Sequence, residues 1–135
     1  MDLQPYKQSL AEGINGSFSE YDEHTSVVVV PLEDGRYQSV KGELQTLDDG
    51  HTQVVCFSSY VCSYHENLNF RNFLSENQKL RYSKFSIHEE FVQIEAIVFI
   101  EFMTAENQNY LINAIREIAE QADAWENKLT GLDVF

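Results

Sequence analysis

The hydrophobic period of the chain changes at Thr104, and this change constrains the fold more than any other feature. Before it, the stretch FVQIEAIVFIEFMT (Phe91 to Thr104) alternates as a strand does, and one set of alternate residues is wholly apolar. That set is Val92, Ile94, Ala96, Val98, Ile100 and Phe102. After it, apolar residues recur at steps of four and three, which is typical of an amphipathic helix that begins at Thr104 as its N-cap. They are Leu111, Ile115, Ile118, Ala122, Trp125, Leu129 and Leu132. The two patterns predict a long strand followed by a long helix, each with one face to bury.

Two Asp-Gly pairs divide the middle of the chain into strands. Asp34-Gly35 and Asp49-Gly50 are hairpin signals. They separate three segments of strand character, at 25–32, 37–47 and 52–62. The sequence therefore predicts an antiparallel meander. The first segment, TSVVVVPL, is apolar at successive positions, which favours a strand buried on both faces.

The remaining segments complete a prediction of α+β class. A short helix is expected to begin at Asp2, with apolar residues Leu3, Tyr6, Leu10 and Ile14 at helical spacing. Within residues 67–80, one helical face carries Phe70, Phe73, Leu74 and Asn77, and Tyr82 to Ile87 reads as a fourth strand. We expect one domain over residues 1–135, with a five-stranded antiparallel sheet and three helices in the order α-β-β-β-α-β-β-α.

Charge and cysteine content limit the classes of partner and the compartment. The chain carries 22 acidic and nine basic residues, for a net charge of −13. A field of that sign repels phosphate backbones and anionic lipid, so neither nucleic acid nor a membrane is expected as a partner. Cys56 and Cys62 share strand parity and lie too far apart along one strand for a mutual disulfide, so we expect free, apolar-packed thiols. With no signal peptide and no long apolar run in the sequence, these thiols predict a cytoplasmic protein.

Known catalytic, cofactor and metal motifs are missing from the sequence. The four histidines, His24, His51, His65 and His88, do not have metal-ligand spacing. The sequence contains no nucleophile elbow, no phosphate-binding loop and no dinucleotide fingerprint. We therefore expect a protein without catalytic, metal or cofactor site.

The second parity set of Phe91 to Thr104 is the candidate functional surface. It consists of Phe91, Gln93, Glu95, Ile97, Phe99, Glu101 and Met103. Ile97 and Phe99 form an apolar centre, and Glu95 and Glu101 form a charged rim, which is the layout of a protein interface. Two interpretations stay open: a helix of the same chain covers the centre, or a second polypeptide does. Val27 and Val29 form a possible partner groove if their face is uncovered.

A longer pattern, from Phe73 to Leu129, resembles a known family. It contains a short helix ending in Asn77, a small strand, the long apolar strand and a helix begun by Thr104. The helix closes on Ala122, Asp123, Trp125, Glu126 and Leu129. In this order and in its acidity the chain is similar to type III secretion effector chaperones and to the YbjN-like proteins that share their fold. The resemblance implies a homodimer that binds another polypeptide and uses apolar grooves on the outer sheet. The first helix departs from the pattern, because Gly13 interrupts it.

We thus expect a non-enzymatic, dimeric protein-binding module that holds or regulates a partner polypeptide. The expected contacts are Phe91, Glu95, Ile97, Phe99, Glu101 and Met103, with Val27 and Val29 in a partner groove. One alternative is a small ligand-sensing or enzymatic domain with a pocket lined by His51, His65 or His88. Another is a YbjN-like regulator without a secretion role.

Overall fold

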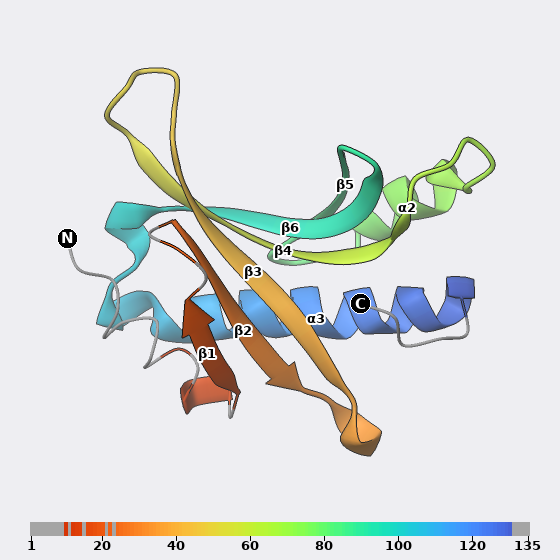
Figure 1. The fold of residues 1–135 in the computed structure, drawn as a ribbon, viewed down its shortest axis with the longest axis horizontal. Coiled ribbons are helices and arrows are strands. Elements are labelled where there is room, and N and C mark those ends of the chain that lie inside the picture. Colours follow the sequence, from red (N-terminus) through yellow and green to blue (C-terminus); the bar gives the residue numbers. More distant parts are fainter. Residues whose placement is uncertain (1–9, 11, 15, 21, 23, 131–135) are drawn as a thin grey trace.

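A single sheet with one long helix across it makes up most of the molecule. The structure is a computed structural model that describes residues 10, 12–14, 16–20, 22 and 24–130. Its elements run β1(Ser17–Glu20), β2(Thr25–Pro31), η1(Glu33–Gly35), β3(Tyr37–Thr46), β4(Gln53–Ser63), α2(Phe70–Asn77), β5(Lys84–His88), β6(Phe91–Phe99), η2(Ile100–Phe102), η3(Ala105–Asn107) and α3(Gln108–Thr130). The predicted α+β class and order of elements are confirmed (Figure 1). Residues 10 and 12–14 are helical, and the rest of the predicted first helix lies outside the described residues.

The sheet is antiparallel in every pairing and has the order β1-β2-β3-β4-β6-β5. The meander of β2, β3 and β4 is as predicted, and its two turns contain Gly35 and Gly50 at φ of +74° and +80°. These left-handed conformations favour glycine, which explains the Asp-Gly signals. The sequence analysis missed β1, a short edge strand that pairs with β2 and brings the sheet to six strands.

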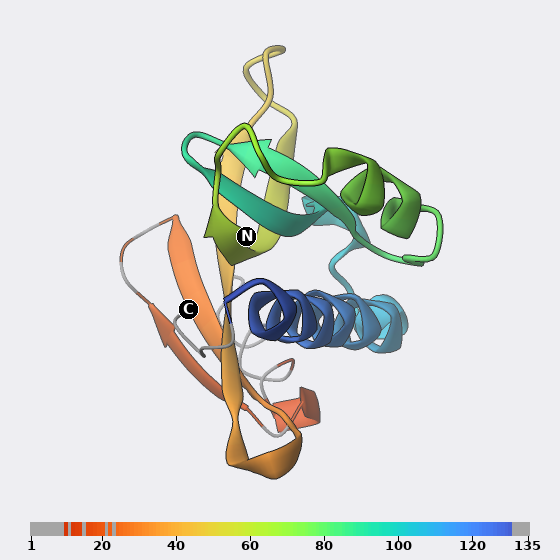
Figure 2. The ribbon, with the colours of Figure 1, turned by 90° about the vertical axis from the view of Figure 1, so that its right-hand side faces the viewer.

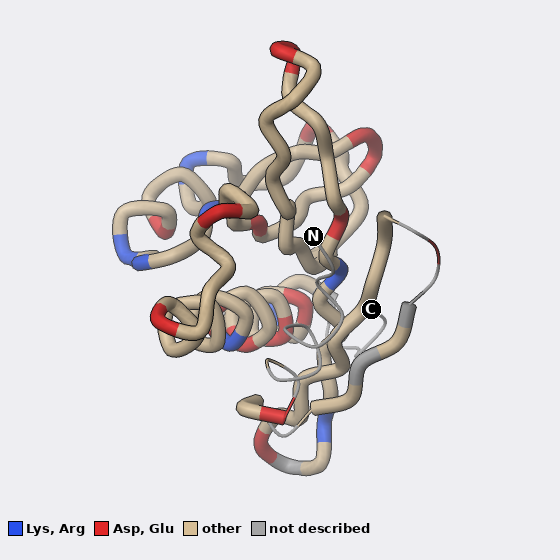
Figure 3. The backbone as a smooth tube through the Cα atoms, turned by 90° about the vertical axis from the view of Figure 1, so that its left-hand side faces the viewer, with Lys and Arg blue, Asp and Glu red and all other residues tan. Residues whose placement is uncertain are grey.

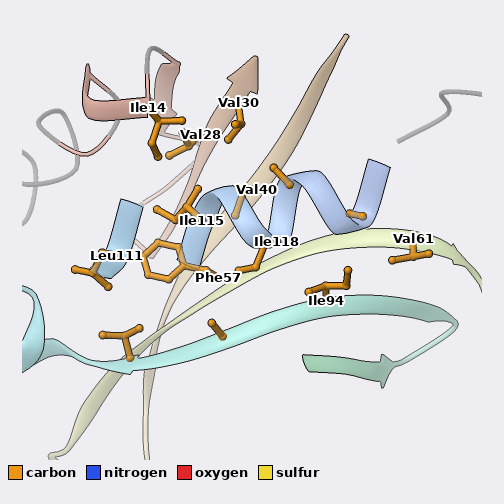
Figure 4. Close-up of a cluster of buried hydrophobic side chains, with 14 of the residues drawn as sticks. Ile14, Val28, Val30, Val40, Phe57, Val61, Ile94, Leu111, Ile115 and Ile118 are labelled. Carbon is orange, nitrogen blue, oxygen red and sulfur yellow. The ribbon is translucent and has the colours of Figure 1, made fainter. Parts of the chain in front are cut away.

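Helix α3 covers one face of this sheet, which we call the inner face. Viewed nearly along α3, the strands curve round it (Figure 2). The apolar residues predicted at steps of four and three are buried from Leu111 to Trp125, whereas Leu129 is exposed and Leu132 lies outside the described residues. Leu111, Ile115 and Ile118 point toward apolar side chains of four strands in Figure 4. Those side chains include Val28, Val40, Phe57 and Ile94. The predicted apolar face of β6 is also buried, at Val92, Ile94, Ala96 and Val98.

Two side chains far apart in sequence fix the segment between α2 and β6. Glu117 of α3 accepts hydrogen bonds from the backbone N–H groups of residues 81, 82 and 83, at 2.9, 2.9 and 3.0 Å, and from the Ser83 hydroxyl at 2.6 Å. Asn77, the last residue of α2, accepts from the Phe85 N–H at 2.6 Å and donates to the Phe85 carbonyl at 3.5 Å. One carboxylate therefore anchors the connection, and one amide occupies the free edge of β5 at Phe85.

Candidate functional site

The face of the sheet opposite α3, which we call the outer face, carries the apolar pair that the sequence predicts. Ile97 and Phe99 of β6 are 53% and 52% exposed. They lie opposite Cys56 and Val54 of β4, which are themselves buried. Among the described residues, α3 packs on the inner face and α2 packs beside β5, so neither helix covers the pair. The centre of the predicted interface is therefore half open.

Glu95, on one side of this centre, is held in a small hydrogen-bonded group. The Cys56 thiol donates to Glu95 Oε2 at 3.4 Å, and the Gln93 amide donates to the same oxygen at 3.4 Å. Gln93 also donates to the Ser86 hydroxyl at 3.4 Å. Burial raises the pKa of Cys56 to about 12, and the neighbouring Glu95 carboxylate adds to the effect. Since the thiolate is the reactive form, Cys56 is poorly suited to act as a nucleophile.

Glu101 and Met103 do not extend the outer face as the alternation predicts. Strand β6 ends at Phe99, and residues Ile100–Phe102 form the 3-10 turn η2. Phe99 pairs with Val54, which is the second residue of β4. Residues of the chain after Phe99 therefore have almost no residue of β4 left to pair with. Beyond that point alternation no longer applies. Met103 is 1% exposed and belongs to the core, so its prediction as an outer-face residue is wrong, while Glu101 is exposed in the turn.

Phe91 and the two valines lie at the two ends of the outer face. Phe91 is half-buried and stacks on Tyr60, with ring centroids 4.5 Å apart. Val27 and Val29 are half-buried, while Val28 and Val30 are buried. The prediction that this strand is buried on both faces is therefore wrong: it has a core face and an outer face. Val27 and Val29 lie between the serines of β1 and residues of β3, their partners being Ser19 and Ser17 on one side and Lys41 and Ser39 on the other.

The cysteines are free and buried, as expected, but they do not share a face. The register of β4 against β6 shifts between Tyr60 and Cys62, which marks a β-bulge. The extra residue reverses the alternation, so Cys62 joins the core cluster, while Cys56 lies on the outer face beside Glu95. Burial raises the pKa of Cys62 as well.

A polar hollow of about 200 Å³ adjoins the apolar pair on the outer face, and it is a candidate site for a small ligand. Its lining includes Lys41, Glu43, Cys56, His88, Glu95 and Ile97. Of the four histidines, His88 alone lines it, and the other three are exposed elsewhere. Across the described part of the chain, no three His, Cys, Asp or Glu side chains are grouped so that they could hold a metal ion.

A second apolar surface, which the sequence analysis did not single out, lies between α2 and β5. Leu74 is 69% exposed and Ile87 54% exposed, and both line a groove of about 280 Å³. Its other lining residues are Phe70, Phe73, Phe85, Ser86 and Val92. The sequence signal that could have indicated this surface is the apolar helical face of Phe70, Phe73 and Leu74. This face is wider than the part of a short helix that packing against one sheet can bury. We call this feature the α2–β5 groove.

Comparison with known proteins adds no functional assignment to this geometry. Over the described residues, no helix has both the length and the apolar character needed to cross a membrane. The chain matches no protein-family model and no curated protein.

Proposed function

We propose that the protein is a non-enzymatic, chaperone-like module that dimerises and binds a partner polypeptide through the outer face of its sheet. The observation that carries the proposal is the half-exposed pair Ile97 and Phe99, on a sheet face that no described helix covers. At these two residues β6 pairs with β4 alone, because its pairing with β5 ends at Glu95. Exposed side chains of this size leave apolar area that association removes from water. Glu95 and Glu101 flank the pair, as polar residues surround interface centres, and Phe91, stacked on Tyr60, lies at the opposite end of β6.

The polarity of the surroundings favours a regulated interface over a permanent one. Beside Ile97, the hollow lined by Lys41, Glu43 and Glu95 keeps charged groups at the edge of the contact. Such groups contribute mainly to the choice of partner and to the association rate. Val27 and Val29 of β2 offer a second apolar strip on the same face, separated from β6 by β3 and β4. We assign self-association to Ile97 and Phe99 and the partner polypeptide to the strip of Val27 and Val29. We place the protein in the cytoplasm, in keeping with its two free cysteines.

The test of self-association is the double variant Ile97→Asp/Phe99→Asp. Both side chains are half-exposed, so the change leaves the core intact, and desolvating two carboxylates opposes association. We expect the wild-type protein to sediment as a dimer and the variant as a soluble monomer. Leu47→Asp is the matched control, because Leu47 is 39% exposed and lies next to the β3–β4 turn. Identical sedimentation of the wild type and the double variant would rule out this dimer interface.

The partner polypeptide is tested by pull-down from native lysate followed by mass spectrometry, with Val27→Asp/Val29→Asp as the matched bait. Recovery of one disordered polypeptide by the wild type, and its loss with the variant, is the result expected of a chaperone-like protein. Equal recovery on both baits would contradict the assignment of Val27 and Val29. A wild-type bait that recovers no polypeptide would favour the regulator without a secretion role.

The polar hollow is the observation that favours a ligand-sensing domain as the second candidate. A small polar ligand there would contact His88, Glu95 and Lys41. The hollow contains one histidine, His88, rather than a pair. Burial raises the pKa of its one thiol, Cys56, to about 12, so the hollow provides no activated nucleophile. Binding of a polypeptide is therefore better supported than chemistry at this place.

A further inference from the structure

The α2–β5 groove is built to accept apolar side chains from outside the chain. Six of its seven lining residues are apolar, and Leu74 and Ile87, on its two sides, are more exposed than any other leucine or isoleucine among the described residues. Phe73 and Phe85 form its floor, with ring centroids 5.0 Å apart, and Trp125 of α3 packs against both rings. The floor is thus fixed by the core, while the two sides remain open to water.

The chemistry of the groove favours a polypeptide over a small metabolite. Small-molecule sites combine an apolar lining with several convergent polar groups, and they usually exceed about 300 Å³. This groove contributes a single serine, Ser86, and measures about 280 Å³. Such a groove suits a few apolar side chains that another backbone presents.

The hydrogen bonds at the free edge of β5 indicate whether a strand or a helix of the partner would present these apolar side chains. A partner strand would have to pair with the free edge of β5, but the Asn77 amide already binds the N–H and the carbonyl of Phe85. Strand addition is therefore blocked at this point of the edge. A helix needs no backbone hydrogen bonds from its partner, and it can place side chains of successive turns into an apolar groove.

The charges of α2 and of the connection after it indicate which residues of the partner helix would flank its apolar side chains. On the α2 side, residues 71–84 contain four of the nine basic residues of the chain and a single acidic residue, Glu76. On the β5 side, the exposed Glu89 and Glu90 follow at the turn into β6, so the excess of positive charge lies on the α2 side alone.

Lys79 is paired with Glu76 at 3.1 Å. Arg71 and Arg81 are exposed, and within the described residues their side chains have no carboxylate within 4.0 Å. Lys84 is also exposed, but it pairs with Glu95 and so belongs to the outer face. Figure 3 shows several Lys and Arg positions on the side of α2 with an acidic position among them, while most Asp and Glu positions lie elsewhere on the backbone.

We propose that the α2–β5 groove binds a short amphipathic helix of a partner polypeptide, in which acidic residues flank the apolar side chains that enter the groove. Leu74 and Ile87 contact the apolar side chains, and Arg71 and Arg81 attract the carboxylates. A net charge of −13 repels acidic partners elsewhere on the molecule, so the local cations also direct the helix to this place. The inference goes beyond the proposed function, because the groove lies outside the outer-face contacts of Ile97 and Phe99.

The experiment is a selection of random peptides displayed on phage against the immobilised full chain. Enriched peptides are then synthesised with a fluorophore and titrated by anisotropy. We expect apolar residues at helical spacing with Asp or Glu beside them. The variant Leu74→Gln/Ile87→Thr should weaken binding by about tenfold or more, because it removes the apolar contacts at both sides of the groove. Leu47→Gln, at an exposed leucine near the β3–β4 turn, is the matched control and should bind as the wild type does.

Charge selection is tested separately with Arg71→Glu/Arg81→Glu, which keeps the apolar lining intact. This variant should weaken the acidic peptides and strengthen analogues in which Lys replaces each Asp and Glu. The proposal is overturned if no peptide is enriched, if the enriched peptides are basic, or if the Leu74→Gln/Ile87→Thr variant binds them unchanged. It is also overturned if that variant changes the sedimentation of the protein alone, since the groove would then contain a second copy. Retained peptide binding by Ile97→Asp/Phe99→Asp would show that the two surfaces act independently.

Discussion

Replacing Glu117 with Gln tests whether one carboxylate of α3 holds the connection between α2 and β5. Glu117 accepts four hydrogen bonds, three from consecutive backbone N–H groups and one from Ser83. Hydrogen bonds to a charged group contribute about 1.5–3 kcal/mol each, but the site is partly exposed and the four bonds share two oxygens, so they do not add. Glutamine keeps one acceptor oxygen, and with that oxygen in the place of Oε1 it turns an amide donor toward the N–H group of residue 81. We expect Glu117→Gln to lower the free energy of unfolding by about 2 kcal/mol.

The loss should depend on pH with a definite sign. Burial opposes ionisation of Glu117, but the Ser83 hydroxyl and the three N–H groups outweigh it and hold the pKa of Glu117 below its ordinary value. A carboxyl group whose folded pKa lies below its unfolded pKa stabilises the fold above the unfolded value, and this stabilisation disappears as the pH falls through the folded value. The difference between the wild type and Glu117→Gln should therefore be full at pH 7 and should shrink below about pH 4.5.

Urea unfolding followed by circular dichroism at a series of pH values measures both effects. A loss of about 2 kcal/mol corresponds to a fall in Tm of roughly 8 °C for a domain of this size. Glu120→Gln is the matched control, because Glu120 is an exposed carboxylate on the same helix, and it should change stability by less than about 0.5 kcal/mol. Equal stability of Glu117→Gln and the wild type at pH 7, or a difference that persists unchanged at pH 3, would refute the reasoning.

Two further changes test the β5 edge and the outer-face thiol. Asn77→Ala removes the amide that binds the Phe85 backbone, so it should cost about 1–2 kcal/mol and promote aggregation of partly unfolded protein, as measured by thermal unfolding with light scattering. Retention of wild-type stability by Asn77→Ala would show that water replaces the amide. In a Cys62→Ala background, Glu95→Gln should speed alkylation of Cys56 by iodoacetamide, because the Glu95 carboxylate raises the pKa of that thiol. A slower or unchanged rate would mean that burial alone controls Cys56.

The regular elements could be predicted from the sequence because each rests on a strong local pattern. Both Asp-Gly turns lie where the chain needs a glycine with positive φ. The apolar residues of α3 that recur at steps of four and three are buried along most of the helix. The parity of β6 correctly placed Ile97 and Phe99 on the face away from α3. In these segments the local pattern and the tertiary packing agree.

The rest depends on partners that are distant in sequence. Met103 was misplaced because alternation holds only while β6 has β4 beside it, and the start of β4 is set by a turn some 50 residues earlier. Cys62 was misplaced because a bulge leaves no mark in a run of strand-forming residues. The anchor at Glu117 joins α3 to a connection more than 30 residues away, so no window of local sequence contains both.

The position of α3 after all six strands also affects how the protein is made. During synthesis the strands leave the ribosome first, and their inner face, with Val28, Val40 and Ile94, then has no long helix to cover it. A sheet with one apolar face exposed is prone to associate with other nascent chains. Because α3 contacts β3, β4 and β6, its arrival should complete the core in one cooperative step rather than domain by domain. We therefore expect nascent chains that lack α3 to depend on ribosome-associated folding factors, and the finished chain to be independent of them.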